Sequence, residues 1–235
     1  MLVKIFDQFL TEELQRQSGT QMGSNDGGIH VDTETGKKHY VKTPETDEQS
    51  HVEVAAAKLY KHAGLETLDP QTIQHKGRTA VKTDWNDHVS RHSLSGLQQD
   101  AQHPETAKQI ALAHHMAVIT NNRDVVGLEY DNLLKHAKGG VVSADQGASF
   151  DYRAMGEKKD FDRDIHPLMN GFQNQEYQSG KVFSKLSHDT MKAAAQHVKD
   201  RLTDKVIDET LAQHNLQKHA ATIKARRDTL IKHFS

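Results

Sequence analysis

The chain has 235 residues, of which 35% are hydrophobic and 26% are charged, and its formal net charge is -2. This length fits one domain, with room for two lobes, and the near-neutral charge excludes a general attraction to nucleic acid or anionic lipid. The sequence has no apolar run of about eighteen residues, so we expect no membrane span. The N-terminus is too short and too mixed for a secretion signal, and the absence of cysteine excludes disulfides and thiolate metal sites. We therefore expect a cytoplasmic protein whose main partner is not nucleic acid.

Histidine is abundant, with seventeen residues, but these residues do not follow the spacing of a metal motif. His88 and His92 stand four apart, and His114 and His115 are adjacent. Two histidines four apart on a helix can bind zinc, but the glutamate that adjoins them in a metalloprotease motif is missing. We expect these histidines to be exposed or locally hydrogen-bonded.

The first part of the chain predicts a short helix, a loop and a β-hairpin. Apolar residues recur at helical spacing over 3–17, which indicates an amphipathic helix. Residues 19–28 are rich in Gly, Ser, Asn and Asp, which favours a loop. The segments IHVD at 29–32 and KHYVK at 38–42 look like strands, and the intervening TETG is the turn of a hairpin.

A second helix and a second strand pair complete an expected N-terminal lobe. Residues 48–63 carry an apolar stripe at helical spacing, and Gly64 is the stop signal of that helix. The segment QTIQHKGRTAVKTDW at 71–85 indicates two short strands around a Lys-Gly turn. We expect residues 1–85 to form a small lobe of strands with one helix packed on it.

The rest of the chain, 86–235, is predicted to be a second and mainly helical lobe. Paired leucines at 133–134 and paired valines at 141–142 indicate a hairpin, whereas 151–180 is polar and shows little periodicity. Helices are expected over 93–100, 104–120, 187–213 and 216–233. The order of these elements predicts an α+β fold.

Three oxygen-bearing side chains lie close together in NNRDVVGLEYDNLL at 121–134 and ADQGASF at 144–150. Asp124 follows a predicted helix, Asn132 precedes two leucines, and Asp145 follows a predicted strand. Phosphoryl transfer from ATP requires one carboxylate that orients a hydroxyl and two oxygen ligands that hold a divalent cation. Taken singly, each of the three is also an ordinary cap or turn residue.

A lysine and a glycine-rich segment precede this group. Lys42 closes the strand KHYVK and follows GSNDGG, whose backbone N–H groups can cradle phosphates because glycine lets the main chain approach closely. The candidate nucleotide contacts in that segment are Gly23, Ser24, Asn25, Gly27 and Gly28. Glu53 lies on the following helix, where it can pair with Lys42. The alternatives are a surface lysine at a hairpin end and a solvated helix glutamate.

In this order the features resemble the protein-kinase-like superfamily, and more closely its atypical branches. Those branches include the HipA-type bacterial serine/threonine kinases and the phosphoinositide-kinase-like group. The resemblance covers about 23–150 and rests on GSNDGG, HYVK, VEVAAAKLY, NNRDVVGLEYDNLL and SADQGASF. It implies a bilobal protein-kinase-like fold, with a small strand-rich N-lobe and a helical C-lobe.

The resemblance also implies roles for individual residues. Lys42 would contact the phosphates of ATP, and Glu53 would hold it in place. Asp124 would be the catalytic aspartate that accepts the proton of the acceptor hydroxyl or orients that hydroxyl. The segment 79–85 would be the hinge between the lobes, with the adenine near Trp85.

The metal ligands implied by the resemblance are Asp145 with Asn132 or Asp131, for Mg2+ or Mn2+. The Asp-Gln-Gly that begins at Asp145 would match the metal-binding Asp-Phe-Gly with its middle residue changed. Eight positions separate Asp124 from Asn132, against about five in protein kinases. Asp131 therefore stays open as the closer ligand.

The function implied is ATP-dependent phosphotransfer by an atypical serine/threonine protein kinase, with ATP and a protein substrate as partners. A small-molecule or lipid-headgroup kinase is the alternative, which a basic pocket near Arg153, Lys158 and Lys159 would favour. A further alternative is a nucleotide-binding pseudokinase that acts as a partner-binding module. By analogy, so compact a kinase would suit a bacterial effector, a toxin or a phage protein, which would place it in a host cytoplasm.

Overall fold

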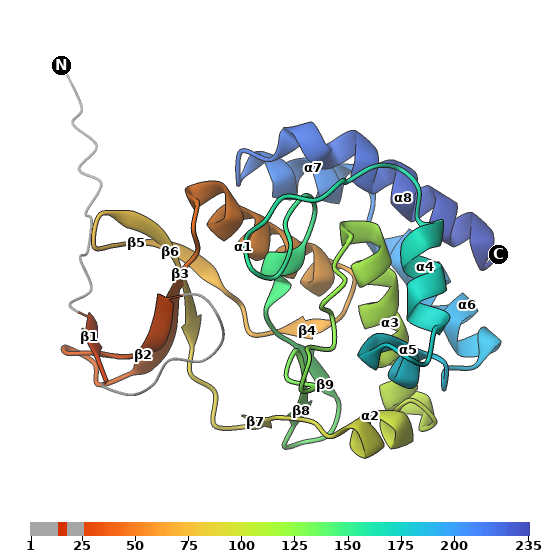
Figure 1. The fold of residues 1–235 in the computed structure, drawn as a ribbon, viewed down its shortest axis with the longest axis horizontal. Helices are drawn as coiled ribbons and strands as arrows, with labels where there is room; N and C mark the ends of the chain where they lie inside the picture. The colour runs from red at the N-terminus through yellow and green to blue at the C-terminus, as the bar shows by residue number, and fades with distance from the viewer. Residues whose placement is uncertain (1–13, 18–25) are drawn as a thin grey trace.

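The computed structural model describes residues 14–17 and 26–235. Figure 1 shows a strand-rich part, in red to yellow, beside a larger part that is mostly helical and is drawn in green to blue. The expected α+β class is confirmed. No helix in the described ranges is both long and apolar enough to cross a membrane.

The strand-rich part is an antiparallel sheet with the order β1-β2-β3-β6-β5. Its strands are β1 (Leu14–Arg16), β2 (Asp26–Asp32), β3 (Lys38–Thr43), β5 (Gln71–His75) and β6 (Arg78–Asp84). The central strand β3 pairs Lys42 with Gly27 of β2 on one side and with Val81 of β6 on the other. The hairpins predicted from 29–42 and 71–85 are confirmed.

Two expectations for this part are wrong. Leu14–Arg16 form a strand and not the end of a helix, because they pair with β2, and tertiary pairing overrides weak local propensity. Gly27 and Gly28 lie in β2 and not in a loop, because the ladder to β3 extends to Asp26. The other parts of these two predictions lie outside the described residues, namely 3–13 and 19–25, which include Gly23, Ser24 and Asn25.

Helix α1 (Asp47–His62) packs on this sheet through β5 and β6, and it confirms the helix expected over 48–63. It begins after Thr46, whose hydroxyl accepts a hydrogen bond from the backbone N–H of Gln49 at 3.2 Å. Its buried apolar stripe consists of Val52, Ala55, Ala56 and Leu59. Its other side packs on η1 (Gln146–Ala148) and α7 (Asp204–Ala212), so α1 lies between the sheet and the helical part.

A second sheet has the order β4-β9-β8-β7. Its strands are β4 (Glu66–Thr67), β7 (Val89–Ser90), β8 (Leu133–His136) and β9 (Val141–Ser143). The expected hairpin of β8 and β9 is confirmed. β4 pairs in parallel with β9, so a strand from the first 85 residues joins a sheet whose other strands come later in the chain. After β5 and β6 the chain crosses to the second sheet again at 85–88, before β7.

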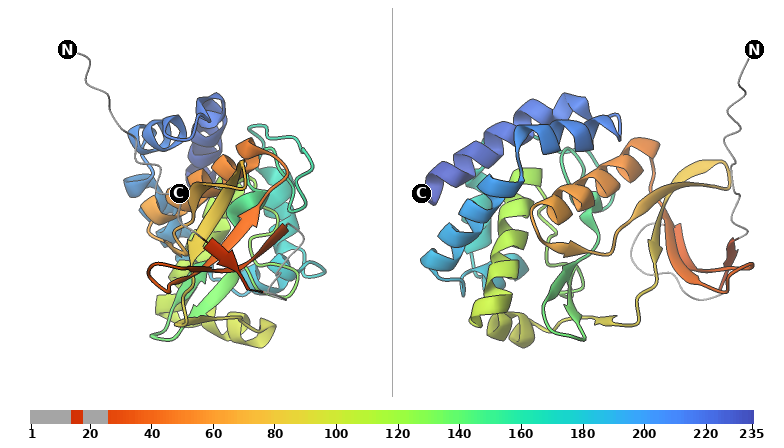
Figure 2. Two further views of the ribbon diagram at one scale, coloured as in Figure 1. Left: turned by 90° about the vertical axis from the view of Figure 1, so that its left-hand side faces the viewer. Right: turned by 180° about the vertical axis from the view of Figure 1, so that it is seen from behind.

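The helical part is built around α3 (Pro104–Thr120), in which every residue from 110 to 120 is buried. A helix that is apolar all round belongs inside a core. The helices near it are α2 (Leu94–Asp100), α4 (His166–Gln173), α5 (Gln178–Phe183), α6 (His188–Arg201) and α8 (Ala220–His233). Figure 2 shows α8 running over the top of the molecule, above α1 and α3. The helices expected over 93–100 and 104–120 are confirmed.

The C-terminal helices differ from the expectation. The helix expected over 187–213 is two helices, α6 and α7, because the Thr203 hydroxyl accepts a hydrogen bond from the N–H of Val206 at 3.3 Å and begins a new helix. The helix expected over 216–233 begins only at Ala220, after the 3-10 turn η2 (Gln217–His219).

The polar segment 151–180 also differs, because it contains α4 and the first three residues of α5. Leu168, Met169 and Phe172 of α4 are buried in the main core. Their spacing covers one face of a short helix, which is too brief to dominate the polar composition around it.

Arg226 of α8 ties the C-terminal helix to the end of α3. Its side chain is buried, and Nε and Nη2 donate to the carbonyl of Val118 at 3.0 and 2.7 Å. Its Nη1 donates to the carbonyls of Asp162 and Asp164 at 2.9 and 2.8 Å. These bonds satisfy a carbonyl at the end of α3 and fix the segment that follows η1.

Candidate active site

Lys42 reaches two carboxylates that come from distant parts of the chain. Its Nζ lies 2.8 Å from Glu53 Oε2 on α1 and 2.7 Å from Asp145 Oδ1 at the start of η1. The side chains of Lys42 and Glu53 are 10% and 5% exposed, whereas that of Asp145 is 52% exposed. The contact expected between Lys42 and Glu53 is therefore present, and Asp145 completes a group of three charges.

Gly27 makes room for this lysine on the neighbouring strand. A Cβ at Gly27 would lie 2.8 Å from the Tyr40 hydroxyl oxygen and 3.1 Å from Lys42 Cβ. Any larger residue would push against both side chains on this face of β3. The position therefore needs a glycine for packing, although Gly27 does not lie in the loop expected there.

Asp145 is held in an unusual backbone conformation. Its φ of 50° and ψ of 69° are left-handed, which costs free energy for any residue other than glycine. Its side chain accepts a hydrogen bond of 3.4 Å from the N–H of Gly147. A Cβ at Gly147 would come within 3.0 Å of Glu53 Oε2, so this turn packs directly against the carboxylate on α1.

The three charges set one another's protonation. Burial raises the pKa of Glu53 to about 7, although the nearby Lys42 acts to lower it. Partial burial acts to raise the pKa of Asp145, but Lys42 outweighs it and holds that pKa below its ordinary value. Burial acts to lower the pKa of Lys42, but the two carboxylates outweigh it and raise that pKa above its ordinary value. Lys42 is therefore an ammonium ion at neutral pH.

The loop between α3 and β8 supplies Asp124 and Asn132. The Nδ2 of Asn132 donates to the backbone carbonyl of Asp124 at 2.7 Å and to its Oδ2 at 3.2 Å. The backbone N–H of Asp124 donates to Oδ1 of the buried Asn122 at 3.0 Å. These bonds bring the two residues together in spite of their wide separation in the sequence.

A turn at Gly127 absorbs the extra residues of this loop. Gly127 has a φ of 76°, and a Cβ there would lie 2.1 Å from Asp131 Oδ1. Only glycine tolerates both that conformation and that close approach. The backbone N–H of Asn132 then donates to the Val126 carbonyl at 3.3 Å, which closes the loop.

Asp124 belongs to a group of carboxylates that repel one another. Burial, with the added charges of Asp145 and Asp131, raises the pKa of Asp124 to about 6. The hydrogen bond from Asn132 acts in the opposite direction. Carboxylate and amide oxygens gathered in this way are the ligands that Mg2+ and Mn2+ prefer, and a bound cation would relieve the repulsion. By their donor types, these residues therefore suit a divalent metal.

Lys159 joins the two loops, and the sequence did not indicate this role. Its Nζ donates to the carbonyl of Asn121, at the end of α3, and to that of Ala148 in η1, at 2.5 and 2.7 Å. Burial, with the nearby charges of Arg123 and Arg226, lowers the pKa of Lys159 to about 7. No local pattern could have predicted this role, because the lysine lies in an irregular segment remote from both loops in the sequence.

The other basic residues expected near an acceptor differ in their surroundings. Lys158 bonds to Asp151 at 2.7 Å and lies 3.4 Å from Glu48. Arg153 is exposed and lies 3.8 Å from Glu157. Lys158 and Lys159 are thus engaged within the protein.

Trp85 lies apart from these charges, in the crossing between the two sheets. Its ring is partly exposed, and its indole N–H donates to Asp87 Oδ1 at 2.8 Å. Its backbone N–H donates to the Lys38 carbonyl at 3.0 Å. The structure thus groups Lys42, Glu53, Asp145, Asp124 and Asn132, with Asp131 near Asp124.

No family model matches the sequence, and no curated protein matches it. Among solved structures, the Helicobacter pylori proinflammatory kinase CtkA is similar over 94% of this chain and 96% of its own, with a TM-score of 0.48 and 11% identity. LicA in complex with AMP is similar over 96% of this chain and 95% of its own, with a TM-score of 0.41 and 12% identity. HipA from a toxin–antitoxin system of Shewanella oneidensis is similar over 83% of this chain and 57% of its own, with a TM-score of 0.41 and 12% identity. At these TM-scores the likenesses carry no weight in assigning function.

Proposed function

We propose that the chain is an ATP-dependent phosphotransferase that acts on a serine or threonine hydroxyl of a protein. The observation that carries this proposal is the Lys42 ammonium, bonded at once to Glu53 on α1 and to Asp145 after β9. Kinases bind the phosphates of ATP with this arrangement, in which a helix glutamate orients a lysine beside an aspartate that can bind metal.

Lys42 would donate to the phosphates of the bound nucleotide, and Glu53 would keep its side chain extended. Asp145, with Asn132 or Asp131, would hold Mg2+ or Mn2+, which neutralises phosphate charge when bound. When the nucleotide and metal are bound, contacts of Lys42 to phosphate and of Asp145 to the metal would replace the Lys42–Asp145 bond. Gly27, Gly28 and Trp85 are proposed to lie near the nucleotide, with residues 79–85 as the hinge between the lobes.

Asp124 would serve the acceptor. An ionised carboxylate there accepts the proton of the acceptor hydroxyl while the hydroxyl oxygen bonds to the γ-phosphorus, and ADP leaves. With a pKa of about 6, most of Asp124 is ionised at neutral pH. The hydrogen bond from Asn132 Nδ2 to Asp124 Oδ2 orients that carboxylate, which supports its assignment as the general base.

Phosphate transfer from radiolabelled ATP with Mn2+ tests the proposal. The acceptors are the chain itself, a mixture of serine and threonine peptides, and a set of sugars and inositol. Asp124→Asn should lower transfer by about 10²- to 10⁴-fold and leave nucleotide binding intact. Asp145→Asn should remove transfer and weaken binding of the metal–nucleotide complex. Glu129→Gln is the matched control, because Glu129 lies in the same loop but is exposed and pairs with Arg91 at 3.1 Å.

The outcomes separate the alternatives. Transfer to peptides that is lost in both aspartate variants supports the protein kinase. Transfer to sugar or inositol alone supports a small-molecule kinase, and a nucleotide-induced rise in melting temperature without transfer supports a pseudokinase. Transfer that survives both substitutions would contradict the roles of Asp124 and Asp145.

A further inference from the structure

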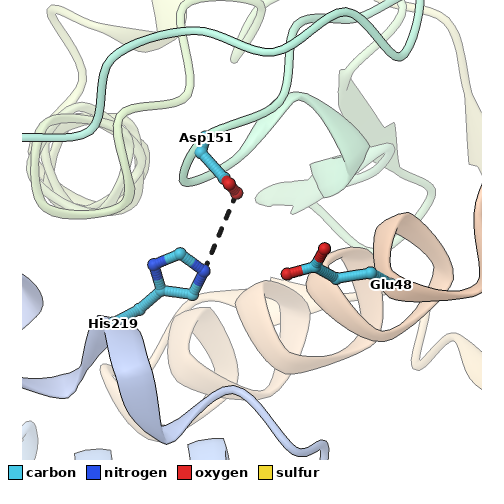
Figure 3. A group of neighbouring side chains, drawn as sticks. All are labelled: Glu48, Asp151 and His219. Carbon is cyan, nitrogen blue, oxygen red and sulfur yellow. Dashed lines mark ion pairs between the residues drawn. The ribbon is translucent and has the colours of Figure 1, made fainter.

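A second group of metal-ligating side chains lies where α1, the segment after η1 and η2 meet. Figure 3 shows the side chains of Glu48, Asp151 and His219 pointing toward one another. Each offers one ligand atom, and these atoms all lie within 4.8 Å of one another. The Nε2 of His219 is 3.7 Å from Asp151 Oδ1.

The inner atoms of this group have no hydrogen-bond partners within the described residues. Both His219 Nε2 and Asp151 Oδ1 are buried without a donor or acceptor. The His219 side chain is only 10% exposed. Buried polar atoms are nearly always paired, so two that face each other unpaired require an explanation.

The lysines around the group bind mainly its outer oxygens. Lys158 donates to Asp151 Oδ2 at 2.7 Å, and Lys218 bonds to Glu48 Oε1. Glu48 Oε2 accepts a hydrogen bond of 3.1 Å from the Tyr152 hydroxyl. This arrangement leaves Asp151 Oδ1 without a hydrogen bond from the lysines, 3.7 Å from the imidazole Nε2.

We propose that Glu48, Asp151 and His219 form a binding site for a divalent first-row transition cation, of which Zn2+ is the best probe. An imidazole with two carboxylates suits such a cation better than Mg2+ or Ca2+, which prefer oxygen ligands alone. Two ligand atoms at about 2.1 Å from one ion lie at most about 4.2 Å apart, so the 3.7 Å separation fits without movement. The ligand atom of Glu48 lies within 4.8 Å of the other two, so it would need to come closer to bind the same ion.

Aromatic rings flank the imidazole of His219. The rings of Phe150 and Phe161 lie 5.2 and 5.5 Å from that of His219 and form an apolar wall beside it.

Lys158 is the competitor for this site. Its ammonium lies 3.4 Å from Glu48 Oε2, and its side chain is 54% exposed. An incoming cation would displace it from Glu48 Oε2, the longer of its two carboxylate contacts, while its 2.7 Å contact to Asp151 Oδ2 can remain. Removal of the Lys158 charge should therefore strengthen metal binding, which is the opposite of what a purely structural ion-pair cluster predicts.

The site would join three segments that are far apart in the sequence. Glu48 lies in the first turn of α1, the helix that also carries Glu53, whereas Asp151 follows η1 and His219 ends η2. A bound ion would hold the N-terminal end of α1 against both other segments. This role is separate from the nucleotide metal and does not depend on the proposed phosphotransfer.

The test is a calorimetric titration of the chelator-treated full chain with ZnCl2, without nucleotide. The background is Asp145→Asn, which weakens the other acidic cluster. We expect one site whose affinity falls at least tenfold in His219→Gln and in Asp151→Asn, and rises severalfold in Lys158→Gln. The rise in melting temperature on addition of Zn2+ should be largest in Lys158→Gln and smallest in His219→Gln and Asp151→Asn. Circular dichroism should show that each variant is folded.

Two results would overturn the inference. One is Zn2+ binding of equal strength with and without His219. The other is no saturable binding both in the parent chain and in a folded Lys158→Gln variant, because that variant keeps all three proposed ligands.

Discussion

Replacing Lys42 by methionine removes the ammonium that Glu53 and Asp145 share, while it keeps a side chain of similar length in β3. Removing one partner of a buried ion pair costs about 3–5 kcal/mol, because a charge is left without compensation. The loss here should fall at the lower end of that range, about 3 kcal/mol. Asp145 is half exposed and can be hydrated, and Glu53 can take up a proton. In a chain of this size, that loss lowers the melting temperature by about 6–12 °C.

The loss in free energy of unfolding caused by Lys42→Met, called the deficit below, should grow as the pH rises. In the native protein burial raises the pKa of Glu53 to about 7, and Lys42 keeps it from rising further. An acid whose pKa is higher in the folded state stabilises the fold at low pH, and this stabilisation is lost as the pH rises through the folded-state pKa. In Lys42→Met that pKa is higher still, so the variant keeps losing stability above pH 7, where the native protein no longer does. The deficit should therefore grow between pH 6 and 8.5.

The assay is unfolding by heat and by urea, followed by circular dichroism at pH 6, 7 and 8.5. Lys38→Met is the matched control, because Lys38 lies on the same strand but is exposed. The double variant Lys42→Met/Glu53→Gln should recover part of the loss, since it removes the uncompensated carboxylate. If Lys42→Met matched Lys38→Met in stability at every pH, the account of the buried charges would be wrong.

Two further predictions concern the loops. If Asp124 is the base and its pKa is near 6, kcat/KM should fall about tenfold per pH unit below pH 6, because the carboxylate must be ionised. A transfer assay over pH 5–8 measures this dependence, and a flat profile would contradict the prediction. The pKa of Lys159 is lowered to about 7, so the folded chain binds fewer protons than the unfolded chain above that pH. This group should therefore add stability as the pH rises from 7 toward 10, by up to about 1.4 kcal/mol per unit. Lys159→Met should lose that slope in urea titrations at pH 7–9.5, and an unchanged slope would refute the internal role of this lysine.

Local signals predicted much of the fold. The apolar stripe and the Gly64 stop place α1 within one residue of its observed start and end, and the periodicity over 104–120 matches α3. The Lys-Gly turn between β5 and β6 is equally local, since Lys76 and Gly77 both have positive φ. The residues that specify each of these elements lie close together in the sequence.

Long-range contacts are what the sequence could not predict. The strand at Leu14–Arg16 exists because β2 lies beside it, and β4 exists because β9 does. The order of Lys42, Glu53, Asp124 and Asp145 along the chain predicted a common site only through resemblance, since no spacing rule brings them together. Lys159 was missed for the same reason, because both of its carbonyl partners are set by tertiary packing.

The central claim is that the Lys42 and Asp145 cluster binds ATP with a divalent metal. A crystal structure with a non-hydrolysable ATP analogue and Mn2+ tests it most directly. The account predicts nucleotide phosphates within hydrogen-bond distance of Lys42 Nζ, and Mn2+ bound to Asp145 together with Asn132, Asp131 or both. Nucleotide density elsewhere on the chain, or the Lys42–Asp145 bond intact at saturating nucleotide, would contradict it.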